Sequence, residues 1–225
     1  MKKTPVSIPH TVWYADDTRR GEREAADVLG LTLYELMLRA GEAAFQVCRS
    51  AYPDARHWLV LCGHGNNGGD GYVVARLAKA VGIEVTLLAQ ESDKPLPEEA
   101  ALAREAWLNA GGEIHASNIV WPESVDLIVD ALLGTGLRQA PRESISQLID
   151  HANSHPAPIV AVDIPSGLLG ENGATPGAGG KTDHNKNFIA LKTSVVTGKK
   201  RGGNGKKQFE SMGVGRWVGG QGKRN

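Results

Sequence analysis

Residues 57–72 read HWLVLCGHGNNGGDGY, and this stretch decides the fold. The apolar run 57–63 has the length and composition of a buried strand, and it ends in glycine. Behind it, apolar residues recur at helical spacing over 68–82. The stretch therefore predicts a strand, a glycine-rich loop and a helix, which together form the opening unit of an α/β protein.

The same alternation continues along the chain. We expect further strands at 84–90, 125–134 and 158–165, and helices at 97–111 and 143–154. The strand runs of Val, Ile and Leu lack alternation, which indicates strands covered on both faces. The pattern predicts an α/β, Rossmann-like three-layer α/β/α sandwich with a mostly parallel central sheet, in which ligands bind beyond the C-terminal strand ends.

Two helical patterns, 14–29 and 33–51, precede this core, and Thr32 and Glu35 have the spacing of a capping box. A chain of 225 residues fits one domain. We expect that domain to comprise a helical preface at 1–52, a Rossmann-like core at 57–178 and a basic Gly- and Lys-rich end at 179–225. Residues 181–225 hold eleven Lys or Arg against two acids and lack an apolar β pattern, so no second domain is expected there.

Composition narrows the choice of partners and location. The formal net charge is zero, which gives no reason to expect a nucleic-acid or membrane partner. No segment approaches eighteen continuous apolar residues, and none follows the two N-terminal lysines. Only Cys48 and Cys62 occur, which suits reduced thiols and a cytoplasmic protein.

The glycine-rich loop formally matches the dinucleotide fingerprint GxGxxG at Gly63, Gly65 and Gly68. Glycines permit close backbone approach, and the N–H groups at a helix start favour an anion, so the loop predicts a phosphate site. Asp70 would repel a phosphate lying directly against it, and must therefore face a sugar hydroxyl, a cation or backbone N–H groups. A glycine-rich turn, with Asp70 favouring the helix dipole, is the alternative.

Three motifs in order, GHGNNGGDG (63–71), VDALLGTG (129–136) and VDIPSG (162–167), resemble the N-terminal domain of the YjeF family, as does LMLRAGEAAF (36–45). The resemblance implies an isomerase, an NAD(P)H-hydrate epimerase that interconverts the R and S epimers of NADHX and NADPHX for nicotinamide nucleotide repair. It implies functional coupling to an NAD(P)H-hydrate dehydratase, to which a longer natural chain could be joined; for the present chain we expect epimerase activity only. It also implies a homodimer, for which the N-terminal helices offer apolar faces.

The resemblance further implies two substrate-binding segments and a bound potassium ion. The substrate-binding residues are Asn66, Asn67, Gly68, Gly69, Asp70, Gly134, Thr135, Gly136, Leu137, Arg138, Gln139, Ala140 and Asp163. The potassium ligands are Asn67, Asp130 and Ser166, which are all oxygen donors at strand ends. Oxygen donors suit hard cations, and a single carboxylate suits a monovalent one better than calcium or magnesium. Each of the three could instead serve only as a turn or strand-end residue.

Asp163 and Lys192 match catalytic positions in this resemblance. Asp163 could exchange a proton with the ring hydroxyl as general acid or base, either to open and reclose the ring or to let water leave and return. An Asx turn is the alternative role for Asp163. Lys192 could stabilise ionised Asp163 or oxyanion character, or could be a solvated lysine in a region that departs from the family pattern.

Two other functions stay open from sequence. An NAD(P)-dependent oxidoreductase would use the GxGxxG loop with Glu91, which falls where a ribose-binding acid belongs. A non-catalytic nucleotide- or partner-binding module of the same fold would need no chemistry at all. His64 lies in the glycine loop but is not expected to be catalytic, and His151 and His155 are expected at the surface.

Overall fold

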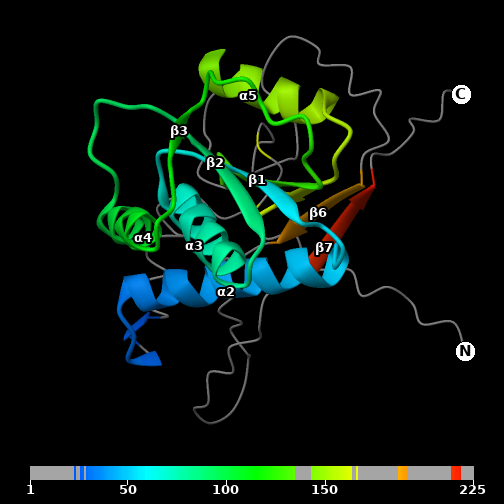
Figure 1. Ribbon diagram of the computed structural model, residues 1–225. Coiled ribbons are helices and arrows are strands. Elements are labelled where there is room, and N and C mark those ends of the chain that lie inside the picture. Colours follow the sequence, from blue (N-terminus) through cyan, green and yellow to red (C-terminus); the bar gives the residue numbers. More distant parts are fainter. Residues whose placement is uncertain are drawn as a thin grey trace, which may run out of the picture.

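The computed structural model describes residues 23, 26–27, 29–134, 143–163 and 166, and the backbone of 187–191 and 214–218. Figure 1 shows a central sheet with α5 on one side and α2, α3 and α4 on the other. In chain order the elements are α2 (Leu33–Ala51), β1 (His57–Cys62), α3 (Asn66–Ala80), β2 (Glu84–Ala89), α4 (Glu98–Asn109), β3 (His115–Ala116), β4 (Leu127–Ala131), α5 (Glu143–Ser154), β5 (Ile159–Ala161), β6 (Asn187–Leu191) and β7 (Val214–Val218).

The strand order is β3-β2-β1-β4-β5-β6-β7. Neighbouring strands pair in parallel from β3 to β6, and β7 pairs antiparallel with β6. From β1 the chain moves outward to β2 and β3, then returns to place β4 on the other side of β1. The predicted doubly wound, mostly parallel sheet is confirmed, and its topological switch point lies between β1 and β4.

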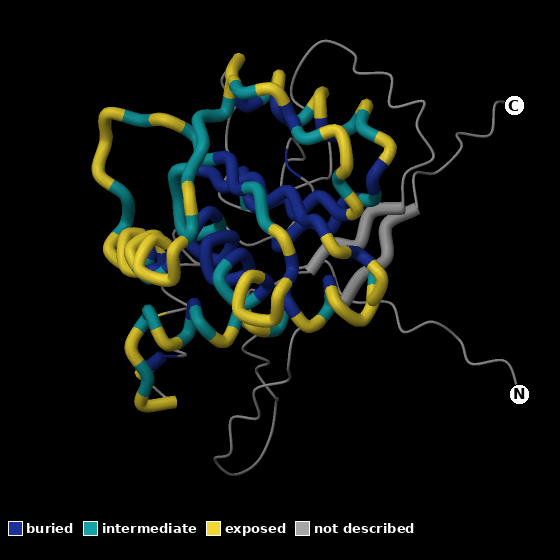
Figure 2. Tube along the Cα trace, in the orientation of Figure 1, coloured by how far each residue is buried: buried dark blue, intermediate teal, exposed yellow. Residues whose placement is uncertain are grey.

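Strand β1 is buried along its whole length, as its unbroken apolar run predicts. Trp58, Val60 and Cys62 belong to the core cluster that contains residues of α2, α3 and α4. Leu59 and Leu61 belong to the cluster that contains residues of α5. The alternation of β1 side chains between two cores makes the three layers, and Figure 2 shows the buried sheet between more exposed helices.

Helix α2 begins with the predicted capping box. The Thr32 side chain accepts from the Glu35 N–H at 3.1 Å, and the Glu35 carboxylate accepts from the Thr32 N–H at 2.7 Å. The buried face of α2 comprises Met37, Gly41, Ala44, Phe45 and Cys48, with the Phe45 ring 5.9 Å from that of Trp58 in β1. This face of α2 packs against the chain's own core, and most of the helix predicted at 14–29 lies outside the described residues, so the expected dimer interface stays a prediction.

Several boundaries differ from the sequence prediction. Helix α3 begins at Asn66, so Asn66 and Asn67 are helical rather than part of the loop. The strands predicted at 125–134 and 158–165 are shorter, and the two-residue β3 was not predicted. The basic end contributes β6 and β7, although its sequence shows no apolar β pattern. Among the described residues, no helix is both long and apolar enough to cross a membrane.

Asp126 is expected to stabilise the sheet in a pH-dependent way. Its Oδ2 accepts from the Arg56 and His57 N–H groups at 2.8 and 2.9 Å, and these bonds lower the pKa of its carboxyl. Folding lowers the pKa of the Asp126 carboxyl. The stabilisation by Asp126 is therefore fully present above the pKa of the unfolded chain, and it is lost as the pH falls through the pKa of the folded chain. We expect Asp126→Ala to cost about 1 kcal/mol at pH 7, measured by urea unfolding. The difference from wild type should vanish at low pH, and the exposed Asp93→Ala should show neither effect; a pH-independent deficit would contradict this account.

Candidate functional site

Polar side chains from three elements gather at the C-terminal edge of the sheet. Asn67 is the second residue of α3, Asp130 is the penultimate residue of β4, and Asp163 and Ser166 follow β5. Asp130, Asp163 and Ser166 are all buried. Because β1, β4 and β5 are neighbours in the sheet, these residues lie at the switch point, where doubly wound folds bind ligands.

Asp130 and Ser166 form the best-defined part of the site. Asp130 Oδ2 accepts from the Ser166 N–H at 2.8 Å, and Oδ1 accepts from the Ser166 hydroxyl at 2.6 Å and the Leu132 N–H at 3.2 Å. The Ser166 hydroxyl oxygen accepts from the Leu133 N–H at 2.9 Å. Burial raises the pKa of Asp130, and these hydrogen bonds oppose that rise. The network joins the ends of β4 and β5 and holds the carboxylate rigidly.

Asn67 and Asp163 converge on Gly134. A Cβ placed on Gly134 would lie 2.8 Å from Asp163 Oδ2 and 3.5 Å from Asn67 Cβ. Both polar atoms of the Asn67 amide are buried and have no hydrogen-bond partner among the described residues. A buried amide without a partner is costly, so the orphaned Asn67 side chain indicates a site built for a ligand.

The first turn of α3, which contains Asn67, has the geometry that favours an anion. Its N-cap is Gly65, which has no side chain to occupy the first-turn N–H groups. The first-turn N–H groups carry partial positive charge and suit a phosphate. The turn is compact, because a Cβ on Gly68 would strike the Gly63 carbonyl oxygen. The predicted phosphate site thus has a physical basis in helix geometry.

Asp70 does not confront that anion site directly. Since α3 begins at Asn66, Asp70 lies in the second turn, and it is buried. Burial raises the pKa of Cys62, and the Asp70 charge contributes to that rise. Burial likewise raises the pKa of Cys48 to about 12. Both cysteines are free and buried, in agreement with the prediction of reduced thiols.

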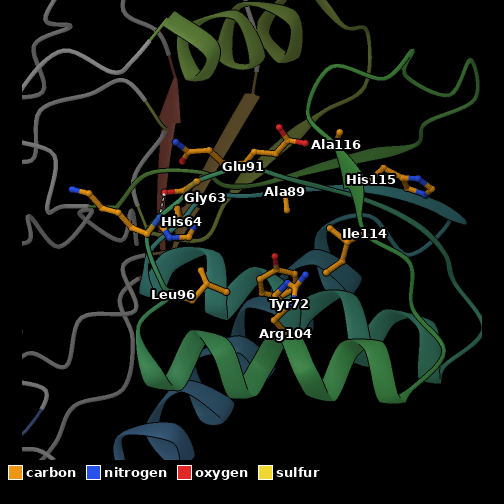
Figure 3. Close-up of a pocket in the computed structure, with 13 residues that line it drawn as sticks. Gly63, His64, Tyr72, Ala89, Glu91, Leu96, Arg104, Ile114, His115 and Ala116 are labelled. Carbon is orange, nitrogen blue, oxygen red and sulfur yellow. Dashed lines mark hydrogen bonds between the residues drawn. The ribbon is translucent and has the colours of Figure 1, made fainter.

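A pocket of about 390 Å³ lies on the other side of the switch point, at the ends of β1, β2 and β3. Figure 3 shows Glu91 and His115 at the strand ends and Tyr72 and Arg104 on the helices, with His64 at the loop. Sequence reasoning considered only His64 and Glu91 of this group. The others come from separated segments, and no motif connects them.

Some of the remaining positions discussed from sequence have packing roles, and others lie outside the described residues. Gly69 packs in α3 close to Met37 and Ala100. The ring of His151 stacks on Trp121 with centroids 4.0 Å apart, and His155 Nδ1 accepts from the Ala157 N–H, so both histidines have packing roles near the surface. Seven predicted residues lie outside the described residues: Thr135, Gly136, Leu137, Arg138, Gln139, Ala140 and Lys192.

Comparison with known proteins identifies the family. Residues 33–194 match the model described as YjeF-related protein N-terminus. The chain is 87% identical to the bifunctional NAD(P)H-hydrate repair enzyme Nnr of Escherichia coli K12, over 98% of this chain and 43% of that protein. It is 32% identical to the NAD(P)H-hydrate epimerase of Rhodopirellula baltica, over 82% of this chain and 71% of that protein. The crystal structure of yeast ynu0 matches with a TM-score of 0.60 and 25% identity, over 70% of this chain and 72% of that one.

The chain therefore belongs to the YjeF-related N-terminal family. It spans less than half the length of the bifunctional relatives from E. coli and Leishmania braziliensis, 43% and 38% respectively. The resemblance inferred from the three motifs is confirmed, and so is the fold.

Proposed function

We propose that this chain is an NAD(P)H-hydrate epimerase that interconverts the R and S epimers of NADHX and NADPHX. The observation that carries the proposal is the convergence of Asp163 and Asn67 on Gly134, next to the uncapped N-terminus of α3. A carboxylate and an anion site at one sheet edge suit a phosphate-bearing substrate with an exchangeable proton. The names of the relatives favour this activity over an oxidoreductase or a binding module.

In this proposal Asp163 is the general acid or base. Its position beyond β5 lets it exchange a proton with the ring hydroxyl at the hydroxyl-bearing carbon. Gly134 leaves room for the ring beside Asp163 Oδ2, since a Cβ there would lie 2.8 Å from that oxygen. The first-turn N–H groups of α3 bind the pyrophosphate. In one route Asp163 takes the hydroxyl proton, the bond from the hydroxyl-bearing carbon to the ring nitrogen breaks, and the proton passes to that nitrogen; reclosure on the other face reverses these steps. In the other route Asp163 protonates the hydroxyl, water leaves, and water returns to the other face with loss of a proton to Asp163.

The donor set fits a potassium ion. Asn67 Oδ1 is buried and lacks a partner among the described residues. Asp130 Oδ2 accepts one hydrogen bond and Ser166 Oγ accepts one, so each oxygen retains a lone pair. Asn67, Asp130 and Ser166 would hold the ion. One carboxylate with neutral oxygens suits a monovalent cation, which would supply fixed positive charge beside the substrate.

Three further proposals accompany the activity. Functional coupling to an NAD(P)H-hydrate dehydratase is supported by the bifunctional names of the relatives. A homodimer, testable by light scattering after size-exclusion chromatography, would need a surface other than the buried face of α2. A cytoplasmic location is supported by the free, buried cysteines.

The activity is tested with mixed NADPHX epimers and an excess of a separate, epimer-specific dehydratase. Recovery of NADPH absorbance should reach completion with this protein, much faster than spontaneous epimerisation allows. Recovery that stalls at the level of dehydratase alone, with the protein folded, would refute the epimerase and favour a binding module.

Potassium should raise the thermal stability through Asn67. An ion at ten times its Kd stabilises the folded state by about 1.4 kcal/mol, which corresponds to roughly 3–6 °C in Tm for a domain of this size. We expect this rise in potassium chloride relative to choline chloride at equal ionic strength. Asn67→Ala should lose it, while Asn109→Ala, at the exposed end of α4, should retain it. An equal rise in wild type and Asn67→Ala, or none in wild type, would contradict the ion site.

A further inference from the structure

The pocket at the ends of β1, β2 and β3 is separate from the Asn67, Asp130 and Asp163 cluster. Its volume of about 390 Å³ falls within the range of small-ligand sites. One wall consists of strand-end residues, including Ala89 at the end of β2, Glu91 two residues beyond it and His115 in β3. The opposite wall comes from helices, with Tyr72 of α3 and Arg104 of α4 (Figure 3).

The lining combines an apolar surface with charged groups at its rim. Ala89, Leu96 and Ile114 offer apolar atoms that suit a flat aromatic ring. Glu91 is an exposed acid, and Lys94 and Arg104 are exposed cations. This arrangement provides a hydrogen-bond acceptor for hydroxyl groups and two cations for a phosphate.

Two buried groups add fixed polar contacts. His64 Nε2 is buried and has no hydrogen-bond partner among the residues that the structure describes, as expected of an atom that would hydrogen-bond to a ligand. Burial raises the pKa of the Tyr72 phenol, which therefore stays neutral, and its oxygen accepts a hydrogen bond from the Arg104 guanidinium. Tyr72 thereby positions the Arg104 guanidinium at the pocket.

The loop between β1 and α3 links the pocket to the candidate active site. Gly63 and His64 line the pocket, and the same loop leads into Asn66 and Asn67 two residues later. In doubly wound sheets a dinucleotide lies across the switch point, with one nucleotide on each side and the pyrophosphate at the helix start. The pocket occupies the β2 side, and Asp130 and Asp163 occupy the β4 and β5 side.

We propose that this pocket binds the adenosine half of the dinucleotide, with Glu91 accepting from ribose hydroxyls and Arg104 and Lys94 binding a 2′-phosphate. The proposal rests on the proposed epimerase function. With two cations against one carboxylate, the pocket favours NADPHX over NADHX. Arg104 and Glu91 are specificity residues that lie on the opposite side of the switch point from the carbon that is inverted.

Steady-state kinetics of two variants test this assignment. Arg104→Gln should raise KM for NADPHX about tenfold, because one charge-assisted hydrogen bond to the 2′-phosphate is lost. KM for NADHX, which has no 2′-phosphate, should change less than about twofold. Glu91→Gln should raise KM for NADHX more than for NADPHX. In both variants kcat should be unchanged, because the reacting carbon is not contacted.

The controls are matched in charge and lie away from the pocket. Glu84→Gln changes the first residue of β2, at the end of the strand away from Glu91, and Lys79→Gln is in the last turn of α3. Neither should alter KM for either substrate. If an active wild type and the Arg104→Gln variant have the same KM for NADPHX, the pocket assignment is overturned while the epimerase function stands.

Binding of nucleotide fragments separates the two proposals. By calorimetry, 2′,5′-ADP should bind wild type more tightly than 5′-AMP does, and Arg104→Gln should remove the difference. This result would support the pocket even if wild type failed to epimerise NADPHX, an outcome that would refute only the epimerase function. Absence of 2′,5′-ADP binding to wild type, or equal binding to Arg104→Gln, would overturn the pocket assignment.

Discussion

Asp163→Asn should lower kcat for epimerisation by about 10²- to 10⁴-fold, the usual contribution of a positioned general acid or base. Asparagine preserves the size of the buried side chain but cannot take or give the proton at neutral pH. The ring should still bind beside Gly134, so KM should change little. The measurement is kcat and KM of both proteins for NADPHX, with Tm compared to confirm folding.

The control for Asp163→Asn is Asp150→Asn, which removes an exposed carboxylate from α5 and should leave kcat unchanged. Folded Asp163→Asn protein that retains kcat within about threefold of wild type would exclude proton transfer by this carboxylate. An Asx-turn role would then be the better account of Asp163.

Gly68→Ala should lower the Tm by roughly 2–8 °C, because a new Cβ would strike the backbone carbonyl oxygen of Gly63. Helix propensity alone predicts a gain of up to about 1 kcal/mol for alanine over glycine. Overpacking costs about 1–3 kcal/mol or more, and here the obstacle is backbone that cannot rotate away. The steric term therefore wins, and the displaced turn should also impair binding of the substrate's phosphates.

Gly65→Ala is the matched control in the same turn. A Cβ on Gly65 would meet nothing within 4 Å, and its φ of −134° is open to alanine. Replacing a glycine N-cap with alanine costs roughly 0.5–1 kcal/mol, which is less than the cost of a clash with backbone. If thermal unfolding showed equal destabilisation by Gly65→Ala and Gly68→Ala, close packing against the Gly63 backbone would not explain the effect of Gly68→Ala.

The strand-end residues could be predicted because parallel topology fixes where they meet. Asp130 and Ser166 are 36 positions apart in sequence, yet they lie at the ends of the neighbouring strands β4 and β5, and their hydrogen bond at 2.6 Å confirms the convergence. The unbroken apolar run of β1 similarly indicated a strand covered on both faces. The roles of Asp130 and Ser166 as ion ligands stay a prediction.

Other features depend on contacts that sequence patterns do not reveal. Asparagine and glycine are poor helix formers, so the start of α3 at Asn66 reflects close packing of the turn rather than propensity. Strand β3 has only two residues and carries no periodic signal. The pocket brings Tyr72, Glu91, Arg104 and His115 together from separate elements, and only the folded chain shows that they are neighbours.

The most direct measurement of the central claim is the conversion of one purified NADPHX epimer into the other, followed by chromatography without any coupling enzyme. With wild type in potassium chloride, a single starting epimer should reach the equilibrium mixture far faster than in buffer alone. The Asp163→Asn protein should lose nearly all of this acceleration. A folded wild-type protein that leaves the starting epimer converting only at the spontaneous rate would contradict the account.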